Sequence, residues 1–363
     1  MTSFTAIDHA HMARALRLAE RGLYTTQPNP RVGCVIAHAD EVVGEGWHQR
    51  AGEPHAEVFA LREAGARARG ATAYVTLEPC AHHGRTPPCA DALIAAGIAR
   101  VVAACTDPNP KVAGGGLRGL TDADIDVQTG LMHEAARELN RGFFSRIERG
   151  RPWLRVKLAM SLDGRTALAN GESKWITGEP ARADVQRWRA RSSAIMTGSG
   201  SLVTDNPRLT VRSPELQQST PPLRVVLDRN LQTSQHAHVL DNAAPTLIVH
   251  APGARPSHKG FEQVECVAVA APEGKLDLHA LLRELAARGV NELQVEAGAT
   301  LCGALFQRGL VDELLLYISP ILLGDQARPL LALPAIAEMV AGRRLRIVDQ
   351  RRIGEDLRLL LRE

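Results

Sequence analysis

The chain has 363 residues, of which 45% are hydrophobic and 23% are charged, and its formal net charge is +3. A chain of this length fits two ordinary domains, and this composition is typical of a globular protein that buries a sizeable core. It contains neither a run of eighteen apolar residues nor a dense basic cluster, so we expect no membrane span and no nucleic-acid surface.

The first part of the chain alternates helical and strand patterns. We expect helices over residues 7–23, where apolar residues recur at a helical period, over 55–69, which is rich in Ala and Glu, and over 90–96. Short runs expected to be strands are 32–36, 41–44, 73–76 and 100–104. Strands separated by helices predict a layered α/β domain.

Between residues 141 and 152 this pattern breaks into charges, two glycines and a proline, and we place the domain boundary there, giving domains 1–150 and 151–363. Strand and helix patterns then alternate again, from a strand at 154–160 to strands at 313–318 and 357–361, so the second domain is also predicted to be α/β. The basic stretch 343–352 alternates with apolar residues, which favours a strand with one solvated face.

The cysteines are spread along the chain without the rhythm of a disulfide framework: they are Cys34, Cys80, Cys89, Cys105, Cys266 and Cys302. The first residues lack the basic head and apolar core of a signal peptide. We therefore expect a cytoplasmic protein, whose thiols more often bind metal or lie buried than pair.

One group of residues predicts a catalytic metal. His55 and Glu57 lie at an expected helix start, and Cys80 and Cys89 are nine positions apart. Zinc binds imidazole nitrogen and thiolate sulfur tetrahedrally, so one His and two Cys leave a fourth position for water. Bound zinc lowers the pKa of that water to near neutrality, and Glu57 can carry a proton from it to a departing amine. A His-x-Glu triplet followed by Pro-Cys and a second Cys is the general signature of zinc deaminases, although their cysteines are usually closer together.

Two other interpretations of the group formed by His55, Glu57, Cys80 and Cys89 stay open. His82 or His83 could complete a closed structural site with His55 and the two cysteines, in a protein that only binds small molecules or nucleic acid. Alternatively, the deaminase could act on another nucleobase, a nucleoside or tRNA, with a second domain that has no catalytic role.

The second domain lacks the glycine pattern of a Rossmann dinucleotide site. Glycine-rich turns do follow expected strands at 198–201 and 297–300, and small residues at a helix start leave N–H groups free to bind phosphate. By itself this signal is weak, because a plain tight turn has the same composition.

Longer motifs resemble one known family over nearly the whole chain. In the first half they are PNPRVGCV (28–35), GEGWH (44–48), GEPHAE (52–57), TLEPCAHHGRTPPC (76–89) and DPNPKV (107–112). In the second half they are KLAMSLDGR (157–165), GESKWIT (171–177), TDNPRLT (204–210) and VEAGATL (295–301). The sequence is thereby similar to the bifunctional deaminase–reductases of riboflavin biosynthesis, and the wide spacing of the cysteines belongs to that pattern.

For the first domain the resemblance implies a cytidine-deaminase-like, three-layer fold with zinc on His55, Cys80 and Cys89, and Glu57 as the catalytic residue. It implies hydrolytic removal of the 2-amino group of 2,5-diamino-6-(5-phosphoribosylamino)pyrimidin-4(3H)-one. Asn29, between two prolines, would hydrogen-bond the substrate. Weaker candidates for the mouth of the pocket are His48, His82, Asp107, Asn109 and Lys111.

For the second domain the resemblance implies a dihydrofolate-reductase-like fold that uses NADPH to reduce the ribosyl group of 5-amino-6-(5-phosphoribosylamino)uracil to ribityl. The implied cofactor contacts are Ala159, Trp175, Ser201, Asp205, Gly298, Ala299, Thr300, Leu301, Cys302, Gly303 and Ala304. The implied substrate contacts are Ser173, Arg189, Leu209, Arg212 and Glu296.

Within that set, Arg189 and Arg212 suit phosphate because a guanidinium grips phosphate oxygens in a bidentate fork. Lys157 and Asp163 are further polar candidates near the reacting sugar. Ala299 stands where other members often carry Pro or Gly, and Cys302 lies within the expected nucleotide turn. We expect small-molecule substrates as partners, and the sequence leaves a homo-oligomer open.

Overall fold

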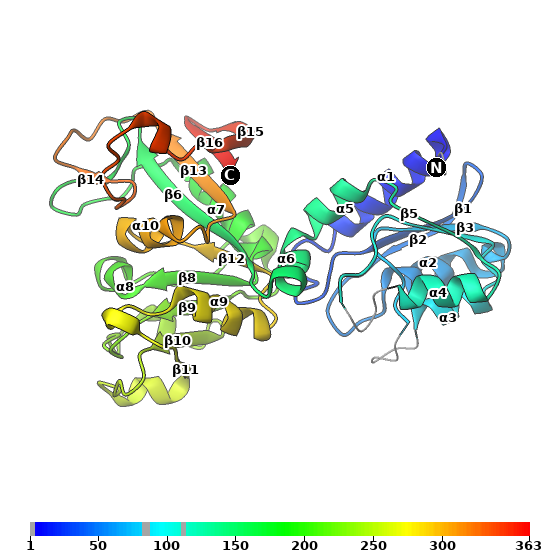
Figure 1. Ribbon diagram of the computed structural model, residues 1–363, viewed down its shortest axis with the longest axis horizontal. Coiled ribbons are helices and arrows are strands. Elements are labelled where there is room, and N and C mark those ends of the chain that lie inside the picture. Colours follow the sequence, from blue (N-terminus) through cyan, green and yellow to red (C-terminus); the bar gives the residue numbers. More distant parts are fainter. Residues whose placement is uncertain (1–3, 82–87, 110–113) are drawn as a thin grey trace. The chain divides into compact units, whose positions relative to one another are not determined.

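The computed structural model describes residues 4–81, 88–109 and 114–363. It divides into two compact units, Met1–Gly150 and Arg151–Glu363, and each is built from a sheet with helices packed on it (Figure 1). Within the described ranges no helix is long and apolar enough to cross a membrane. His82, His83 and Lys111, which the sequence offered as candidates, lie outside the described residues.

The first unit contains a five-stranded sheet in the order β2-β1-β3-β4-β5. Its strands are β1 (Gly33–His38), β2 (Glu41–Trp47), β3 (Thr72–Val75), β4 (Arg100–Ala103) and β5 (Asp126–Thr129). β3, β4 and β5 are parallel, and β1 is antiparallel to both of its neighbours. The helices are α1 (Ala6–Glu20), α2 (Ala56–Ala64), α3 (Cys89–Ala95), α4 (Gly115–Asp122), α5 (His133–Leu139) and α6 (Arg141–Arg149), and a 3₁₀ turn, Gly65–Ala68, extends α2.

Both faces of this sheet are buried, which makes three layers. On β1, Cys34 and Ile36 join a core with α2 and α3, whereas Val35 and Ala37 join the core beneath α1. Successive side chains of a strand point to opposite faces, so a strand covered on both sides becomes apolar throughout. In Figure 1, α1 and α5 lie on one face of the sheet and α2, α3 and α4 on the other.

One sequence-based expectation is wrong in this unit. The stretch from residue 141, interpreted as a break in the pattern, continues as the helix α6 up to Arg149. Its two aromatic residues, Phe143 and Phe144, are buried in the core beneath α1. The charged residues of this stretch suggested a break in the pattern, but they belong to a helix whose buried face carries the aromatic residues. Only Gly150, with a φ of 65°, takes the left-handed conformation that ends the helix.

The second unit is organised around a nine-stranded sheet in the order β11-β10-β9-β8-β12-β6-β13-β16-β15. Its strands are β6 (Trp153–Ser161), β8 (Ala194–Gly198), β9 (Leu223–Leu227), β10 (Thr246–His250), β11 (Glu265–Ala268), β12 (Glu292–Val295), β13 (Glu313–Ser319), β15 (Arg346–Ile353) and β16 (Asp356–Arg362). β7 (Arg165–Ala167) and β14 (Arg328–Pro329) form a separate two-stranded ladder.

The helices of this unit are α7 (Glu179–Arg191), α8 (Ser199–Asp205), α9 (Leu278–Ala287) and α10 (Ala299–Gln307). Short 3₁₀ turns occur at Pro214–Leu216, His238–Leu240, Lys259–Gln263, Pro272–Gly274 and Met339–Ala341. β16 runs antiparallel to β13 and to β15, and the other strand pairs in the large sheet are parallel.

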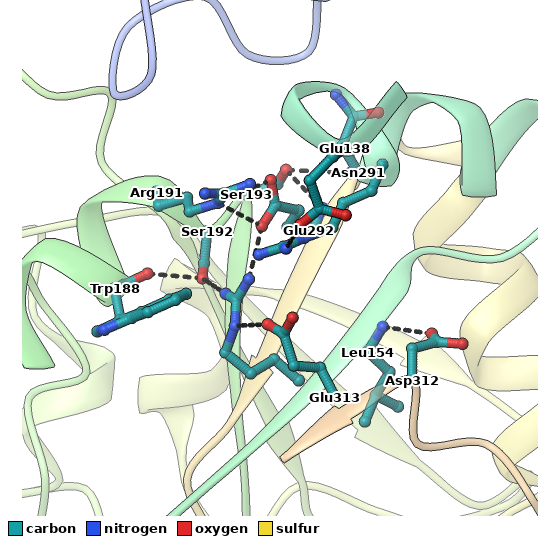
Figure 2. Close-up of polar contacts among 12 residues, drawn as sticks. Glu138, Leu154, Trp188, Arg191, Ser192, Ser193, Asn291, Glu292, Asp312 and Glu313 are labelled. Carbon is teal, nitrogen blue, oxygen red and sulfur yellow. Dashed lines mark hydrogen bonds and ion pairs between the residues drawn. The ribbon is translucent and has the colours of Figure 1, made fainter. Parts of the chain in front are cut away.

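The two faces of the second sheet differ in character. One is apolar: Leu residues and Val residues of β6, β12 and β13 pack with α9 and α10. On the opposite face the fully buried Arg155 of β6 lies between two carboxylates, with Nε 2.7 Å from Glu313 and Nη2 2.8 Å from Glu292. Arg191, at the end of α7, also donates to Glu292 at 2.8 Å (Figure 2). Buried charges persist only when paired, so this network fixes the end of α7 to β12.

The basic stretch near the C-terminus is only partly as expected. The strand β15 begins at Arg346, and its residues are exposed on both faces except for Asp349 and Ile353, which are partly covered. The reason is its place at the edge of the sheet, where it pairs with β16 alone.

Candidate active sites

The first unit brings the three expected metal ligands together. His55 is the N-cap residue of α2, Cys80 follows β3, and Cys89 begins α3. The Nδ1 atom of His55 lies 3.5 Å from the sulfur of Cys80 and 3.3 Å from that of Cys89. Among the described residues this is the one group of three or more His, Cys, Asp or Glu side chains with ligand atoms close enough to share a metal ion.

These distances fit zinc. With Zn–S of about 2.3 Å and Zn–N of about 2.0–2.1 Å, a tetrahedral ion separates nitrogen from sulfur by about 3.5 Å. The hydrogen bond between the two thiols lowers the pKa of Cys80, and the same contact raises the pKa of Cys89. The two sulfurs lie within 4.8 Å of each other and share negative charge, which a divalent cation offsets.

Glu57 lies beside this group and has no partner for one of its oxygens. Its side chain is buried, at 3% exposure, and Oε2 makes no hydrogen bond. Burial raises the pKa of the Glu57 carboxyl to about 7, against the lowering effect of the nearby His55. A buried carboxyl that exchanges its proton near neutral pH suits a general acid–base.

Two glycines of β2 allow α2 to approach the sheet closely and so place His55 and Glu57. A Cβ atom on Gly46 would lie 2.5 Å from the carbonyl oxygen of Ala56 and 2.8 Å from the amide nitrogen of Ala60. Gly44 meets the next turn of α2 in the same way. The first turn of α2 therefore rests directly on strand backbone.

Gly46→Ala is expected to push this first turn outward. Overpacking of this kind typically costs about 1–3 kcal/mol, so the free energy of unfolding of the first unit should fall, and zinc affinity should fall with it. Urea denaturation and a competitive chelator titration measure the two effects. Gly119→Ala in α4 is the matched control, because its Cβ meets nothing within 4 Å. Equal zinc affinity in both variants would contradict the role of Gly46.

Asn29 and His48 are paired at the same site. The Nδ2 atom of Asn29 lies 3.1 Å from Nε2 of His48, and Nδ1 of His48 lies 3.1 Å from the carbonyl oxygen of Pro54. A carbonyl can only accept, so Nδ1 carries the proton, and Nε2 accepts from the amide of Asn29. The His48 ring packs edge-on against His55, with ring centres 5.4 Å apart. The carbonyl oxygen of Asn29 takes no part in this contact with His48.

A residue that sequence reasoning missed holds the loop of Asn29 in place. Asn140 accepts from the backbone N–H of Arg31 and donates to its carbonyl oxygen, both at 2.8 Å. Asn140 lies between α5 and α6, 109 positions from Arg31. No local pattern could have indicated this pair.

In the second unit, two of the expected substrate contacts form an ion pair. Arg189 of α7 donates through Nε and Nη2 to the two carboxylate oxygens of Glu296, each at 2.8 Å, and through Nη1 to the carbonyl oxygen of Thr210 at 3.0 Å. Burial opposes the charge on Glu296, but Arg189 outweighs it and lowers the pKa of this carboxyl to about 2. The guanidinium fork expected to grip phosphate is thus occupied by Glu296.

Other polar side chains surround the ion pair of Arg189 and Glu296. Gln294 is fully buried, donates to Glu296 at 2.8 Å, and leaves its own Oε1 without a partner. Lys157 lies on β6 two positions after Arg155 and so points to the same face of the sheet, with its Nζ 5.7 Å from the centre of the Tyr317 ring. Burial lowers the pKa of Lys157. A half-buried lysine, a carboxylate and an unpartnered amide oxygen together offer contacts for a polyhydroxylated sugar.

The expected cofactor residues fall in several segments near the carboxyl ends of the parallel strands. Gly198 and Gly298 are the N-caps of α8 and α10, and neither helix start is capped by a side chain. Lys174 lies 4.0 Å from Asp205, so the segment of Trp175 approaches the end of α8. Trp175 is exposed and stacks on the guanidinium of Arg182, 4.6 Å away.

Not every candidate faces a site. Cys302 and Leu209 are buried, so their side chains belong to cores. A Cβ on Gly303 would lie 2.2 Å from the carbonyl oxygen of Ala332, so Gly303 packs on backbone. Arg212 is exposed. The carboxylate of Asp163 accepts from the N–H groups of Leu323 and Gly324 and thereby holds a loop.

The chain matches two protein families in the same order as its units. Residues 5–105 match the cytidine and deoxycytidylate deaminase zinc-binding region. Residues 152–359 match the RibD C-terminal domain.

Full-length relatives match both units at once. The riboflavin biosynthesis protein RibD of Escherichia coli is 50% identical over 98% of this chain and 99% of its own length, and that of Haemophilus influenzae is 47% identical over 99% and 98%. The structure of Acinetobacter baumannii RibD superimposes with a TM-score of 0.91 at 44% identity, covering 98% of both chains.

A further solved structure bears a name that describes both activities. It is the diaminohydroxyphosphoribosylaminopyrimidine deaminase/5-amino-6-(5-phosphoribosylamino)uracil reductase of Thermotoga maritima, at a TM-score of 0.87 and 30% identity over 98% of both chains. The chain described above therefore belongs to the RibD family, the bifunctional deaminase–reductases of riboflavin biosynthesis.

Proposed function

We propose that the first unit deaminates 2,5-diamino-6-(5-phosphoribosylamino)pyrimidin-4(3H)-one at the group formed by His55, Cys80, Cys89 and Glu57. The observation that carries the proposal is the convergence of one imidazole nitrogen and two sulfurs beside a buried carboxyl with an unpartnered oxygen. When bound, zinc supplies Lewis acidity toward the attacking water. Glu57 takes the proton of that water and delivers it to the departing amine.

Asn29 orients the pyrimidine in this proposal. Because its amide N–H is donated to His48, its carbonyl oxygen faces the substrate and accepts from a ring or amino N–H. His48 acts as the fixed acceptor behind Asn29.

We further propose that the second unit reduces the ribosyl group of the deaminated product to ribityl at Lys157, Arg189 and Glu296. NADPH supplies the hydride when bound. The N-cap residue of α10 is Gly298, so no side chain caps the start of this helix, and its first backbone N–H groups are available to a cofactor phosphate. Lys157, Glu296 and Gln294 hold the sugar by hydrogen bonds, and Arg212 is the exposed cation available for the substrate phosphate.

A deaminase for another nucleobase with a non-catalytic second domain is the less favoured alternative, because the second unit matches the reductase domain of the family. A single assay distinguishes the two. Zinc-loaded protein is given the phosphoribosyl diaminopyrimidinone and NADPH, and ammonia release and NADPH absorbance are followed. Ammonia without NADPH oxidation would exclude the bifunctional assignment.

Removal of zinc is expected to separate the two activities. Dialysis against a chelator should abolish ammonia release, since the ligands lie in the first unit, and should leave NADPH oxidation unchanged when 5-amino-6-(5-phosphoribosylamino)uracil is supplied directly. Re-addition of zinc should restore ammonia release. Persistent deamination in metal-free protein, checked by metal analysis, would rule out the metal assignment.

A further inference from the structure

The carboxylate of Glu78, two positions before the ligand Cys80, is held in a cradle of backbone N–H groups. Its Oε2 accepts from Asp107 and Gly114, each at 3.1 Å, and its Oε1 accepts from Gly116 at 3.0 Å and Leu117 at 3.4 Å. The side chain is 4% exposed. Its charge is therefore met by backbone dipoles, including those at the first turn of α4.

This cradle joins the metal-binding segment to a polar segment. The N–H of Glu78 itself donates to the carbonyl oxygen of Cys105 at 2.8 Å. A Cβ on Gly116 would lie 1.8 Å from the carbonyl oxygen of Pro79, so the start of α4 also touches the residue just before Cys80. The segment after β4 is thus fixed to the metal-binding segment on two sides.

The polar groups fixed in this way are those of Asp107 and Asn109. Asp107 Oδ1 accepts from the backbone N–H of Asn109 at 2.8 Å, so whatever fixes the position of Asp107 also restrains Asn109. A carboxylate needed only for packing could be replaced by any buried anchor. Through these bonds the Glu78 carboxylate instead sets Asp107 and Asn109 relative to Cys80, one of the three side chains whose ligand atoms converge.

We propose that Glu78 is a positioning residue for deamination, which acts through Asp107 and Asn109 to hold the pyrimidine against the metal. This inference rests on the proposed deaminase function. Its role is to orient the substrate, and it takes no part in moving protons.

Glu78→Gln is the test, because it keeps the size of the side chain but turns one acceptor oxygen into a donor that faces N–H groups. The KM for ammonia release should rise about 10-fold or more, whereas kcat should change by less than about 3-fold. Bound zinc and NADPH oxidation should match the wild type. Glu78→Asp keeps the charge on a shorter side chain and should give an intermediate KM.

The exposed Glu134→Gln is the matched control and should behave as the wild type. The absorption spectrum of the cobalt-substituted protein should be the same in Glu78→Gln and wild type, which shows that the metal ligands have not moved. An unchanged KM in both Glu78 variants would overturn the proposal, as would loss of metal together with kcat. Failure of the deaminase function itself would be distinguishable, because the wild type would then release no ammonia.

Discussion

Glu57→Gln is expected to lower the rate of ammonia release by a factor of about 10²–10⁴, the usual contribution of a positioned acid–base. The substitution keeps the shape of the side chain but removes its ability to carry a proton. Ammonia release under saturating substrate measures the effect directly. NADPH oxidation from the deaminated intermediate should be unchanged, because Arg189 and Glu296 belong to the other unit.

Zinc should remain bound in this variant, since Glu57 is not among the three side chains whose ligand atoms converge. Metal analysis with one zinc per chain would agree with a proton carrier, and an empty variant would contradict it. Glu63→Gln, at the other end of α2, is the matched control. If that control loses activity to the same degree, the effect of Glu57 is one of fold and not of chemistry.

Glu296→Gln is expected to abolish NADPH oxidation and to destabilise the second unit. The change leaves the buried guanidinium of Arg189 without its bidentate partner, and breaking a buried pair from one side costs about 3–5 kcal/mol. Urea denaturation measures the loss of stability. Ammonia release should persist, because the metal group lies in the first unit.

The pH dependence of that loss follows from the pKa of Glu296, which is lowered to about 2. A carboxyl with a lowered pKa stabilises the folded state above its unfolded value of about 4.3, and this stabilisation is lost as the pH falls towards 2. The difference in unfolding free energy between wild type and Glu296→Gln should therefore be full at pH 6 and smaller at pH 3. A difference that does not change over this range would show that the ion pair contributes nothing.

Arg189→Lys supplies the control for geometry. It keeps the positive charge but not the planar fork, so it can satisfy only part of the Glu296 carboxylate. We expect stability and NADPH oxidation between those of the wild type and Glu296→Gln.

The sequence by itself predicted the convergence of His55, Cys80 and Cys89 and the layered α/β organisation. His55, Glu57, Cys80 and Cys89 could be predicted because zinc chemistry demands few residue types and the flanking motifs restrict their spacing. The strand β1 could be predicted because it is covered on both faces and is therefore apolar along most of its length.

Only the tertiary structure decided which distant groups meet. Arg189 and Glu296 are 107 positions apart, and both were expected to contact substrate, yet they bind each other. The cradle of Glu78 is built from N–H groups, which every residue except proline carries, so no residue type indicates it. The charges of 141–149 concealed a helix because its aromatic face is recognised only once the core beneath α1 is known.

These outcomes share one physical reason. Metal ligands and strand cores depend on side-chain chemistry and local period, which are written in the sequence. Ion pairs and backbone cradles depend on which strands are neighbours and which face each side chain takes, and the order β8-β12-β6-β13 that sets this is a property of the folded sheet.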